Sequence, residues 1–466
     1  MFSVTTYKNK EVAVFGLGRS GLTAAEALHA GGAKVYLWDD NEKARDKSIN
    51  LGFDIKKFDE LDANNISALV MSPGVPIYGP KINWAAAWAH ENDIPIIGDI
   101  ELFAREINST PENIRPKTIG ITGTNGKSTT TALIAHILQN AGRDVRMGGN
   151  IGTGVLSLAP PKAGAIYVIE LSSYQLDLTK SLHLDVAIQI NVSEDHIERH
   201  GTMERYVAAK RNIFANQNSE DYAIIGVDDD FGEELATLLM AKGSRRVIPI
   251  SSGQFVTCGI SSINQFLWDN SSGRANKIAD LHNALALPGN HNGQNAAAAF
   301  AACRAIGLSD ETIVEGIMNF GGLKHRLQKI GTIGKIQFYN DSKATNADAS
   351  AQALNSFPRL RWIAGGQAKS DGIDPLSRFF PKIAKSYLFG AAAERFSNNL
   401  KNFPHEVFET LAQATQKAYQ DAIETGDEEL IVLSPACASF DQYSDFEARG
   451  DDFINVVNDI IAKNQK

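Results

Sequence analysis

The feature that most constrains the fold is a glycine-rich loop, Gly120-Ile-Thr-Gly-Thr-Asn-Gly-Lys-Ser-Thr129, set between two apolar segments. The segment that leads into it, Thr118 to Thr122, has the length and composition of a buried strand. The segment after it carries apolar residues at helical spacing, from Leu133 to Leu138, and ends near Gly142. A strand, a glycine loop and a helix in this order are typical of a parallel α/β sheet.

The same loop indicates a phosphate-binding site. Glycines let backbone N–H groups approach phosphate oxygens, and a helix N-terminus adds positive potential. Lys127 can reach outer phosphates, and the Ser128 hydroxyl can ligate Mg²⁺. The spacing differs from the usual phosphate loop, because Ile121 stands where the first glycine is expected. A glycine turn that only caps the helix is the alternative, but the strand–loop–helix context favours a nucleoside triphosphate site.

Strands and helices alternate on both sides of this loop. The other strands that we expect are Glu11–Phe15, Lys34–Trp38, Ala68–Met71, Ile166–Ile169, Val186–Val192, Lys335–Tyr339, Arg361–Ala364, Tyr387–Phe389 and Leu430–Leu433. A chain of 466 residues is too long for one core. The polar stretch Asn108 to Lys117 is interpreted as a linker, and Gly321-Gly322 as a second break. We therefore predict three α/β domains, residues 1–107, 108–321 and 322–466, with residues 251–276 unassigned.

Composition narrows the class of protein further. A net charge of −9 argues against nucleic acid as a general partner, because phosphate backbones bind basic faces. Cys258, Cys303 and Cys437 are too far apart to predict a disulfide framework or a zinc site. The N-terminal apolar run is too short for a signal peptide, and no run of about 18 apolar residues predicts a membrane span. We expect a cytoplasmic protein.

Polar residues follow two further strands of the central region. Glu170 ends one expected strand, and Asp195-His196 comes shortly after another. Because parallel strands place their carboxyl ends at one edge of a sheet, both should lie beside Lys127. A carboxylate and a neutral imidazole there can hold divalent cations that bridge phosphates. Each taken singly is more typical of structural hydrogen bonding, but the shared edge favours a site.

A second glycine motif lies near the N-terminus. Gly16-x-Gly18-x-x-Gly21, followed by Asp39, fits the dinucleotide fingerprint and on its own permits an NAD-dependent dehydrogenase. The motif marks a diphosphate at a helix N-terminus, and UDP also has a diphosphate. Both interpretations remain open from this motif alone.

These residues, together with later motifs, resemble the Mur ligase family. The later motifs are Gly-Asn-His291-Asn292-Gly-Gln-Asn295, Gly-Leu-Lys-His-Arg326, Asn-Asp341-Ser-Lys343-Ala-Thr345-Asn, Gly-Gly-Gln-Ala-Lys369-Ser, and Leu-Ser-Pro-Ala-Cys-Ala-Ser439-Phe440-Asp-Gln-Tyr-Ser-Asp-Phe446-Glu-Ala-Arg-Gly. They run in order over nearly the whole chain. The last two resemble the family members that add D-glutamate to UDP-N-acetylmuramoyl-L-alanine in peptidoglycan precursor synthesis.

The resemblance implies a fold, a reaction and partners. Rossmann-like N-terminal and C-terminal domains would bind the UDP substrate and the amino acid, on either side of a P-loop-type ATP-binding domain. ATP would phosphorylate the substrate carboxylate, and the amine would attack the acyl phosphate. Two Mg²⁺ ions would reduce the repulsion between carboxylate and triphosphate. The family also implies a cytoplasmic enzyme of cell wall biogenesis, with roles in cell shape and division, and we expect a monomer.

The resemblance also implies roles for single residues, position by position. Around ATP it places Gly123, Thr124, Asn125, Gly126, Lys127, Ser128, Thr129, Asn292, Asn295, Arg326 and Asp341. Around the UDP substrate it places Arg19, Ser20, Asp39, Asp40, Ser72, Gly74, Asn150 and His196. Around D-glutamate it places Lys343, Thr345, Lys369, Ser439, Phe440 and Phe446; two lysines and two hydroxyls suit two carboxylates. The catalytic set is Lys127, Glu170, His196 and Lys210, and the metal set is Ser128, Glu170, His196 and Lys210.

Lys210 is the residue for which pattern and resemblance differ most. Its helical stretch alone predicts a solvated surface lysine. In the family the matching lysine is carbamylated, which turns an ammonium into a carboxylate ligand for Mg²⁺.

Three other functions remain as alternatives to the D-glutamate ligase. One is another ligase of the superfamily, a folylpolyglutamate synthase or a MurE-type enzyme. The N-terminal UDP-type domain argues against the synthase, and the Ser-Pro-Ala-Cys-Ala-Ser run against the MurE type. The others are a dehydrogenase and a non-catalytic ATP-binding module.

Overall fold

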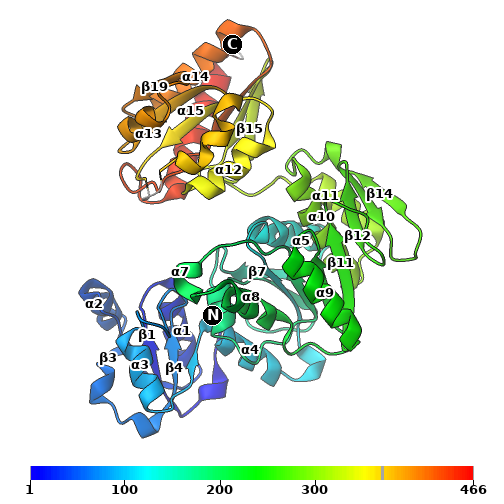
Figure 1. Ribbon diagram of the computed structural model, residues 1–466. Coiled ribbons are helices and arrows are strands. Elements are labelled where there is room, and N and C mark those ends of the chain that lie inside the picture. Colours follow the sequence, from blue (N-terminus) through cyan, green and yellow to red (C-terminus); the bar gives the residue numbers. More distant parts are fainter. Residues whose placement is uncertain (1, 369–371, 465–466) are drawn as a thin grey trace. The chain divides into compact units, whose positions relative to one another are not determined.

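The described chain contains three β-sheets, each with helices packed against it (Figure 1). The computed structural model describes residues 2–368 and 372–464. Residue contacts divide the chain into two compact units: Met1–Ala284 with Asn290–Phe320, and Leu285–Gly289 with Gly321–Lys466. The first unit holds two of the sheets and the second unit holds the third. The expected α/β fold class is confirmed.

The N-terminal sheet is parallel, with strand order β3-β2-β1-β4-β5. Its strands are β1 (Glu11–Phe15), β2 (Lys34–Trp38), β3 (Asp54–Ile55), β4 (Ile66–Met71) and β5 (Ile96–Ile97). Its helices are α1 (Arg19–Ala30), α2 (Glu42–Asn50), α3 (Trp84–Glu91) and α4 (Asp99–Ser109), with short 3₁₀ turns η1 (Thr5–Tyr7), η2 (Phe58–Glu60) and η3 (Ala63–Asn65). The first two expected strands are confirmed with their bounds, and the third begins two residues earlier than predicted.

The central sheet has nine strands in the order β14-β13-β12-β11-β10-β9-β6-β8-β7. They are β6 (Lys117–Thr122), β7 (Asp144–Gly149), β8 (Ala165–Glu170), β9 (Val186–Gln189), β10 (Tyr222–Gly226), β11 (Arg246–Ser251), β12 (Ile260–Ile263), β13 (Phe266–Asp269) and β14 (Asn276–Asp280). Its helices are α5 (Lys127–Asn140), α6 (Ser173–Asp177), α7 (Ile197–His200), α8 (Met203–Arg211), α9 (Asp230–Lys242), α10 (Asn290–Ala305) and α11 (Asp310–Met318), with η4 (Glu112–Ile114), η5 (Val155–Ser157), η6 (Asn212–Phe214) and η7 (Leu281–Asn283).

Two sequence interpretations of the central region need correction. The expected strand Val186–Val192 ends at Gln189, because the next residues turn towards the phosphate loop, where the carbonyl of Asn191 accepts from the N–H of Thr124 at 2.9 Å. The unassigned stretch 251–276 contains a hairpin of β12 and β13. Its turn residues Asn264 and Gln265 both have positive φ, 51° and 59°, which is the backbone of a tight two-residue hairpin turn.

The third sheet has the strand order β15-β16-β20-β17-β18-β19 and is parallel apart from β15. Its strands are β15 (Gln328–Ile333), β16 (Ile336–Asn340), β17 (Leu360–Gly365), β18 (Ile383–Phe389), β19 (His405–Phe408) and β20 (Glu429–Leu433). Its helices are α12 (Ala347–Ser356), α13 (Ala393–Asn399), α14 (Leu411–Thr425), α15 (Phe446–Asn464) and the 3₁₀ segment η8 (Asp374–Lys382). All four expected strands are present; β18 begins four residues earlier than predicted, and the ends of the other three differ by at most one residue.

The predicted boundary at residue 107 falls inside α4, which continues to Ser109. One apolar cluster contains residues of the N-terminal sheet, such as Val12, and of the central sheet, such as Ile169. Phe103 of α4 joins them, with its ring centroid 5.1 Å from that of Tyr167. The two sheets of the first unit therefore share a core, and the bounds of the three domains stay a prediction.

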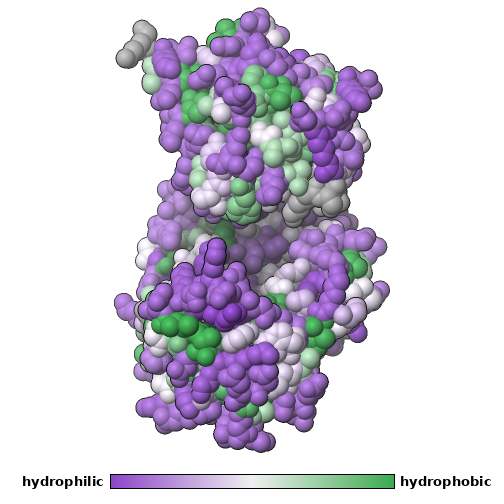
Figure 2. All heavy atoms as spheres, turned by 90° about the vertical axis from the view of Figure 1, so that its left-hand side faces the viewer, coloured by the Kyte–Doolittle hydropathy of each residue, from purple (hydrophilic) through white to green (hydrophobic). Residues whose placement is uncertain are grey.

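One face of the protein is predominantly polar. Figure 2 shows a face on which hydrophilic residues predominate and apolar residues form separate patches. No helix in residues 2–368 or 372–464 combines the length and apolarity needed to cross a bilayer. The three cysteines are free thiols, two of them buried.

Candidate active site

The phosphate loop joins β6 to α5, as the sequence predicts. Gly126 has φ 83° and immediately precedes Lys127, the first residue of α5. Its left-handed backbone suits glycine. Lys127 Nζ donates to the carbonyls of Gly123 and Thr124 at 2.9 and 2.8 Å, so its positive charge lies over the loop. Ser128 and Thr129 follow in the first turn of α5, where the helix N-terminus favours an anion.

Helix α10 packs against α5 and carries two of the residues expected around ATP. Asn295 Oδ1 accepts from the Thr130 hydroxyl at 3.1 Å, and Asn295 Nδ2 donates to Asn292 Oδ1 at 3.0 Å. A Cβ on Gly126 would lie 2.3 Å from Asn295 Oδ1. Asn292 and Asn295 therefore lie beside the phosphate loop, and a side chain at position 126 would require the Asn295 amide to shift.

Lys210 is buried, which corrects the expectation of a solvated helix lysine. Only 1% of it is exposed, since α8 packs Lys210 against the phosphate loop. Its Nζ donates to the Gly123 carbonyl at 2.7 Å and lies 4.6 Å from the centroid of the Tyr206 ring. Burial, with the nearby charge of Lys127, moves the pKa of Lys210 well below its usual value. A neutral amine in this position is a nucleophile, which an exposed ammonium is not.

Glu170 ends β8, the strand next to β6, and its carboxylate faces two different environments. Oε1 accepts from Asn150 Nδ2 at 2.8 Å, whereas Oε2 is buried without a hydrogen-bond partner. A buried carboxylate oxygen of this kind is costly unless something ligates it. Glu170 therefore fits Mg²⁺, although residues 2–368 and 372–464 contain no cluster of three or more His, Cys, Asp or Glu that could hold a metal.

His196 comes from the loop after β9, the strand on the other side of β6. It precedes α7 in a left-handed backbone, with φ 56°. Its Nδ1 and the hydroxyl of Tyr174 form a 3.0 Å hydrogen bond, and the two rings lie 4.9 Å apart. The ring is therefore held in one orientation by a neighbour at the start of α6.

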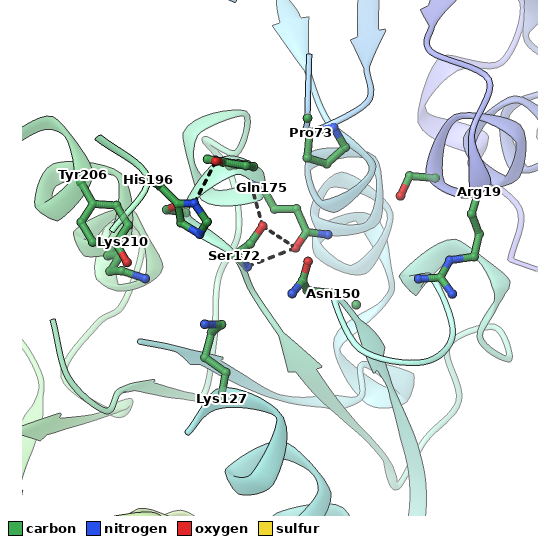
Figure 3. Close-up of a pocket in the computed structure, with 14 residues that line it drawn as sticks. Arg19, Pro73, Lys127, Asn150, Ser172, Gln175, His196, Tyr206 and Lys210 are labelled. Carbon is green, nitrogen blue, oxygen red and sulfur yellow. Dashed lines mark hydrogen bonds between the residues drawn. The ribbon is translucent and has the colours of Figure 1, made fainter. Parts of the chain in front are cut away.

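A cavity of about 410 Å³ brings these groups together (Figure 3). Its lining residues are Arg19, Ser20, Pro73, Gly74, Lys127, Gly149, Asn150, Ser172, Ser173, Tyr174, Gln175, His196, Tyr206 and Lys210. Figure 3 shows His196, Tyr206 and Lys210 on one side and Arg19, from the N-terminal sheet, on the opposite side. Residues of the glycine turn after β1 thus share one cavity with the phosphate-loop lysine.

Sequence reasoning missed half of this lining. Ser172 to Gln175 were not expected, although the sequence does carry a signal for them. Ser172 and Gln175 form a capping box at the start of α6, and Ser172 lies two residues after Glu170. Pro73, Gly149 and Tyr206 carry no comparable pattern, because only the packing of the two sheets brings them to the cavity.

Three expected UDP-substrate residues do not line this cavity. The carboxylate of Asp39 accepts from the N–H groups of Leu17 and Asn41, at 2.6 and 2.8 Å. Asp40 accepts from the indole N–H of Trp84, and Ser72 donates to the Gly16 carbonyl. These side chains brace the turns around the glycine motif.

The remaining expected residues belong to the second unit. Asp341, Lys343 and Thr345 follow β16, and Ser439 and Phe440 follow β20, the neighbouring strand. Lys343 Nζ lies 3.9 Å from the centroid of Phe446, and Ser439 is buried, whereas Phe440 is 70% exposed. Lys369 lies outside the described residues.

Asp341 is buried and directly follows β16. It accepts from the Leu327 N–H at 3.2 Å and the Ser434 hydroxyl at 2.8 Å. Burial raises the pKa of Asp341 to about 7, against the opposing effects of these donors and of Arg326. It lies in the same loop region as the proposed amino-acid residues.

The fold and the cavity define a class: an α/β protein of three sheets whose phosphate loop opens into a cavity shared with a second glycine turn. Solved structures with this fold include a UDP-N-acetylmuramate–alanine ligase, MurC, from Thermotoga maritima, with a TM-score of 0.57 and 16% identity over 97% of this chain and 100% of that one. The FolC protein of Escherichia coli matches with a TM-score of 0.54 and 19% identity, over 79% and 93%. At these identities the likeness shows the fold alone.

Sequence comparison identifies the family. Residues 121–303 match the Mur ligase middle domain. A UDP-N-acetylmuramoylalanine–D-glutamate ligase of Caulobacter vibrioides is 52% identical over 99% of this chain and 98% of its own length. The ligases of the same name from Phenylobacterium zucineum and Rhodopseudomonas palustris are 51% and 47% identical, each over at least 97% of both chains. The chain belongs to the Mur ligase family, in its UDP-N-acetylmuramoylalanine–D-glutamate ligase branch. Members of the family are ATP-dependent ligases that form amide bonds, so the expected enzyme class is confirmed.

Proposed function

We propose that the protein joins D-glutamate to UDP-N-acetylmuramoyl-L-alanine, with ATP converted to ADP and phosphate. The observation that carries the proposal is the single cavity lined by Lys127 and Lys210 together with Arg19, Ser20 and Gly74 of the N-terminal sheet. A nucleotide-sugar at the glycine turn can there extend its carboxylate towards the outer phosphate of ATP. The names of the full-length relatives support the same substrates.

The proposed reaction has two bond-forming steps. The carboxylate of the L-alanyl group attacks the terminal phosphorus of ATP, ADP leaves, and an acyl phosphate forms. The amine of D-glutamate then attacks the carbonyl carbon, loses a proton, and the tetrahedral intermediate expels phosphate. Lys127 and the N-terminus of α5 would stabilise the charge on the transferred phosphoryl group.

Mg²⁺ is part of the proposal because the residues present fit it. Glu170 Oε2 and the Ser128 hydroxyl would hold one ion, and His196 with a carbamylated Lys210 a second. When bound, the ions supply positive charge between two anionic reactants. Carbamylation requires a neutral amine to attack CO₂, and the buried, low-pKa state of Lys210 supports this step.

The other proposed roles follow the family resemblance. Gly123–Thr129, Asn292, Asn295, Arg326 and Asp341 would contact ATP. Arg19, Ser20, Gly74, Asn150 and His196 would contact the UDP substrate, with Asp39, Asp40 and Ser72 fixing the turns behind them. Lys343, Thr345, Lys369, Ser439, Phe440 and Phe446 would contact D-glutamate. We also propose that the enzyme acts as a cytoplasmic monomer in peptidoglycan precursor synthesis, and so supports cell shape and division.

The decisive experiment measures phosphate release from ATP with UDP-N-acetylmuramoyl-L-alanine and a panel of amino acids. We expect release only when both the UDP substrate and D-glutamate are present, with L-alanine and diamino acids far slower. Assays with NAD(H) form the control for the dehydrogenase alternative. Faster release with another amino acid would overturn the proposed substrate, and NAD(H) turnover would overturn the proposed reaction.

A further inference from the structure

A fully buried arginine lies behind the loops proposed to bind the amino acid. Arg449, in the first turn of α15, has no exposed surface. Its Nε donates to the Ser342 hydroxyl at 3.0 Å and its Nη2 to the Ser342 carbonyl at 2.8 Å. Its Nη1 donates to the carbonyls of Gly365 and Ala438, at 3.4 and 3.3 Å. One guanidinium thus contacts three separate loops.

Those three loops leave neighbouring strands of the third sheet. Ser342 follows β16, Ala438 follows β20, and Gly365 ends β17, and these strands are adjacent in the order β16-β20-β17. Two of the three contacts are next in sequence to residues of the proposed amino-acid site. Ser342 precedes Lys343, and Ala438 precedes Ser439.

Three further hydrogen bonds connect the same loops. The hydroxyl of Ser342, which accepts from Arg449, donates to the carbonyl of Phe446 at 2.8 Å. Gln367 and Ala438 exchange backbone hydrogen bonds of 2.8 and 3.0 Å, which pair the loop after β17 with the loop after β20. Phe446 is the residue against which Lys343 packs. The loops that carry Lys343, Ser439 and Phe446 are therefore joined by one hydrogen-bond network around Arg449 and Ser342.

This hydrogen-bond network can also fix the geometry of the proposed amino-acid site, in addition to stabilising the domain. The planar guanidinium offers five donors in a fixed fork, so its acceptors hold a fixed geometry relative to one another. A site binds a small dianion tightly when the hydrogen-bond donors of the site are already in place before the dianion arrives. If the donors must be ordered during binding, the ordering costs binding free energy.

We infer that Arg449 is a positioning residue for the amino-acid substrate: together with Ser342 it sets the spacing of the loops that carry Lys343, Ser439 and Phe446. This inference rests on the proposed D-glutamate site. Arg449 itself is too deep in the domain to touch the substrate, and acts through Ser342 and the carbonyls of Gly365 and Ala438.

The test compares the Michaelis constants for D-glutamate and for UDP-N-acetylmuramoyl-L-alanine in Arg449→Lys and Ser342→Ala. A lysine keeps the positive charge but cannot bond the four acceptors at once. We expect the KM for D-glutamate to rise at least about 10-fold in Arg449→Lys and several-fold in Ser342→Ala. The KM for UDP-N-acetylmuramoyl-L-alanine should stay within about 2-fold, because its proposed contacts all belong to the first unit.

Arg361→Lys is the matched control. Arg361 is also buried in the third sheet, and it bonds the Tyr387 hydroxyl, the Asp421 carbonyl and the Glu429 carboxylate. It stands near the start of β17, at the opposite end from Gly365. This variant should lose comparable stability in a thermal melt while the KM for D-glutamate stays unchanged.

The outcomes separate the inference from the proposed function. If wild-type enzyme releases no phosphate with D-glutamate, the proposed function fails. If wild type is active but folded Ser342→Ala and Arg449→Lys keep the normal KM for D-glutamate, Arg449 is not a positioning residue. An equal rise in the KM of all substrates, or the same rise in Arg361→Lys, would also overturn the inference, because it would reflect general loss of structure. Ser342→Ala removes a single oxygen and so keeps the test valid if Arg449→Lys folds poorly.

Discussion

The lysine on α8 shows how much a single residue depends on its surroundings. Lys210 is 1% exposed and bonds the Gly123 carbonyl, so its low pKa follows from burial beside a second cation, Lys127. From sequence, a lysine in this helical stretch is expected in solvent, because nothing local records that α8 packs on the phosphate loop. Burial of that side chain is a tertiary property.

We predict that Lys210→Ala reduces turnover by about 100-fold or more, the scale of losing one electrostatic group at a reacting centre. Added acetate or formate should restore part of the activity, because a free carboxylate can replace a carbamate ligand. Lys242→Ala, which changes an exposed lysine on α9, should leave turnover unchanged. An active Lys210→Ala enzyme would contradict the metal-ligand role.

Asp341 gives a prediction about pH. Its pKa in the folded state, about 7, lies above the usual value for an aspartate, so the folded protein holds this proton over a range in which the unfolded chain has lost it. Stability contributed by the protonated form is therefore present at low pH and lost as pH rises towards 7. At pH 8 the loss is at most about 4 kcal/mol, at about 1.4 kcal/mol per pKa unit.

We therefore expect Asp341→Asn, which mimics the neutral side chain, to become more stable relative to wild type between pH 5 and pH 8. Denaturant unfolding of both proteins without ligands, at the two pH values, measures this difference. Parallel pH dependence in the two proteins would show that Asp341 does not titrate in this range.

At the scale of elements, the phosphate loop was predictable because its signal is local. A buried strand, three glycines and a segment with apolar residues at helical spacing specify β6, the loop and α5 without reference to the rest of the chain. The early end of β9 was not predictable, because Asn191 leaves the sheet to bond the loop. Likewise Tyr174 reaches His196 only through the fold, although the capping box of Ser172 and Gln175 marks that segment in the sequence.

The two ends of α5 allow a controlled test of the loop. Gly126 and Gly142 flank the helix with φ of 83° and 73°, so alanine is strained at both positions by about 1 to 2 kcal/mol. Only at Gly126 would the new Cβ meet a side chain, Asn295, at 2.3 Å; nothing lies within 4 Å at Gly142. We predict that Gly126→Ala raises the KM for ATP at least about 10-fold, whereas Gly142→Ala leaves it unchanged. If the two substitutions change the KM for ATP equally, Asn295 does not belong to the ATP site.

At the scale of the whole molecule, the proposed substrates divide between the two compact units. Every residue proposed for the UDP substrate belongs to the first unit, and every residue proposed for D-glutamate belongs to the second. A ligand that binds only the folded form of one unit stabilises it by RT ln(1 + [L]/Kd), about 2.7 kcal/mol at a concentration of 100 Kd. Each substrate should therefore raise the melting temperature of a different unit. The sequence break at Gly321-Gly322 already suggests this division.

We predict that saturating UDP-N-acetylmuramoyl-L-alanine raises the melting temperature of the first unit by about 3 °C or more and leaves that of the second unit nearly unchanged. The tryptophans make this measurable. Trp362 is the one tryptophan in residues 321–466. It is buried, and its indole N–H donates to the Ser434 carbonyl at 2.8 Å. The other four tryptophans belong to the first unit: Trp38, Trp84, Trp88 and Trp268. Subtracting the fluorescence melt of Trp362→Phe from that of wild type isolates the transition of the second unit, and L-alanine serves as the control ligand. If the UDP substrate raises the melting temperature reported by Trp362 as much as that reported by the other four tryptophans, the two units unfold together. The substrate could then not be assigned to one unit.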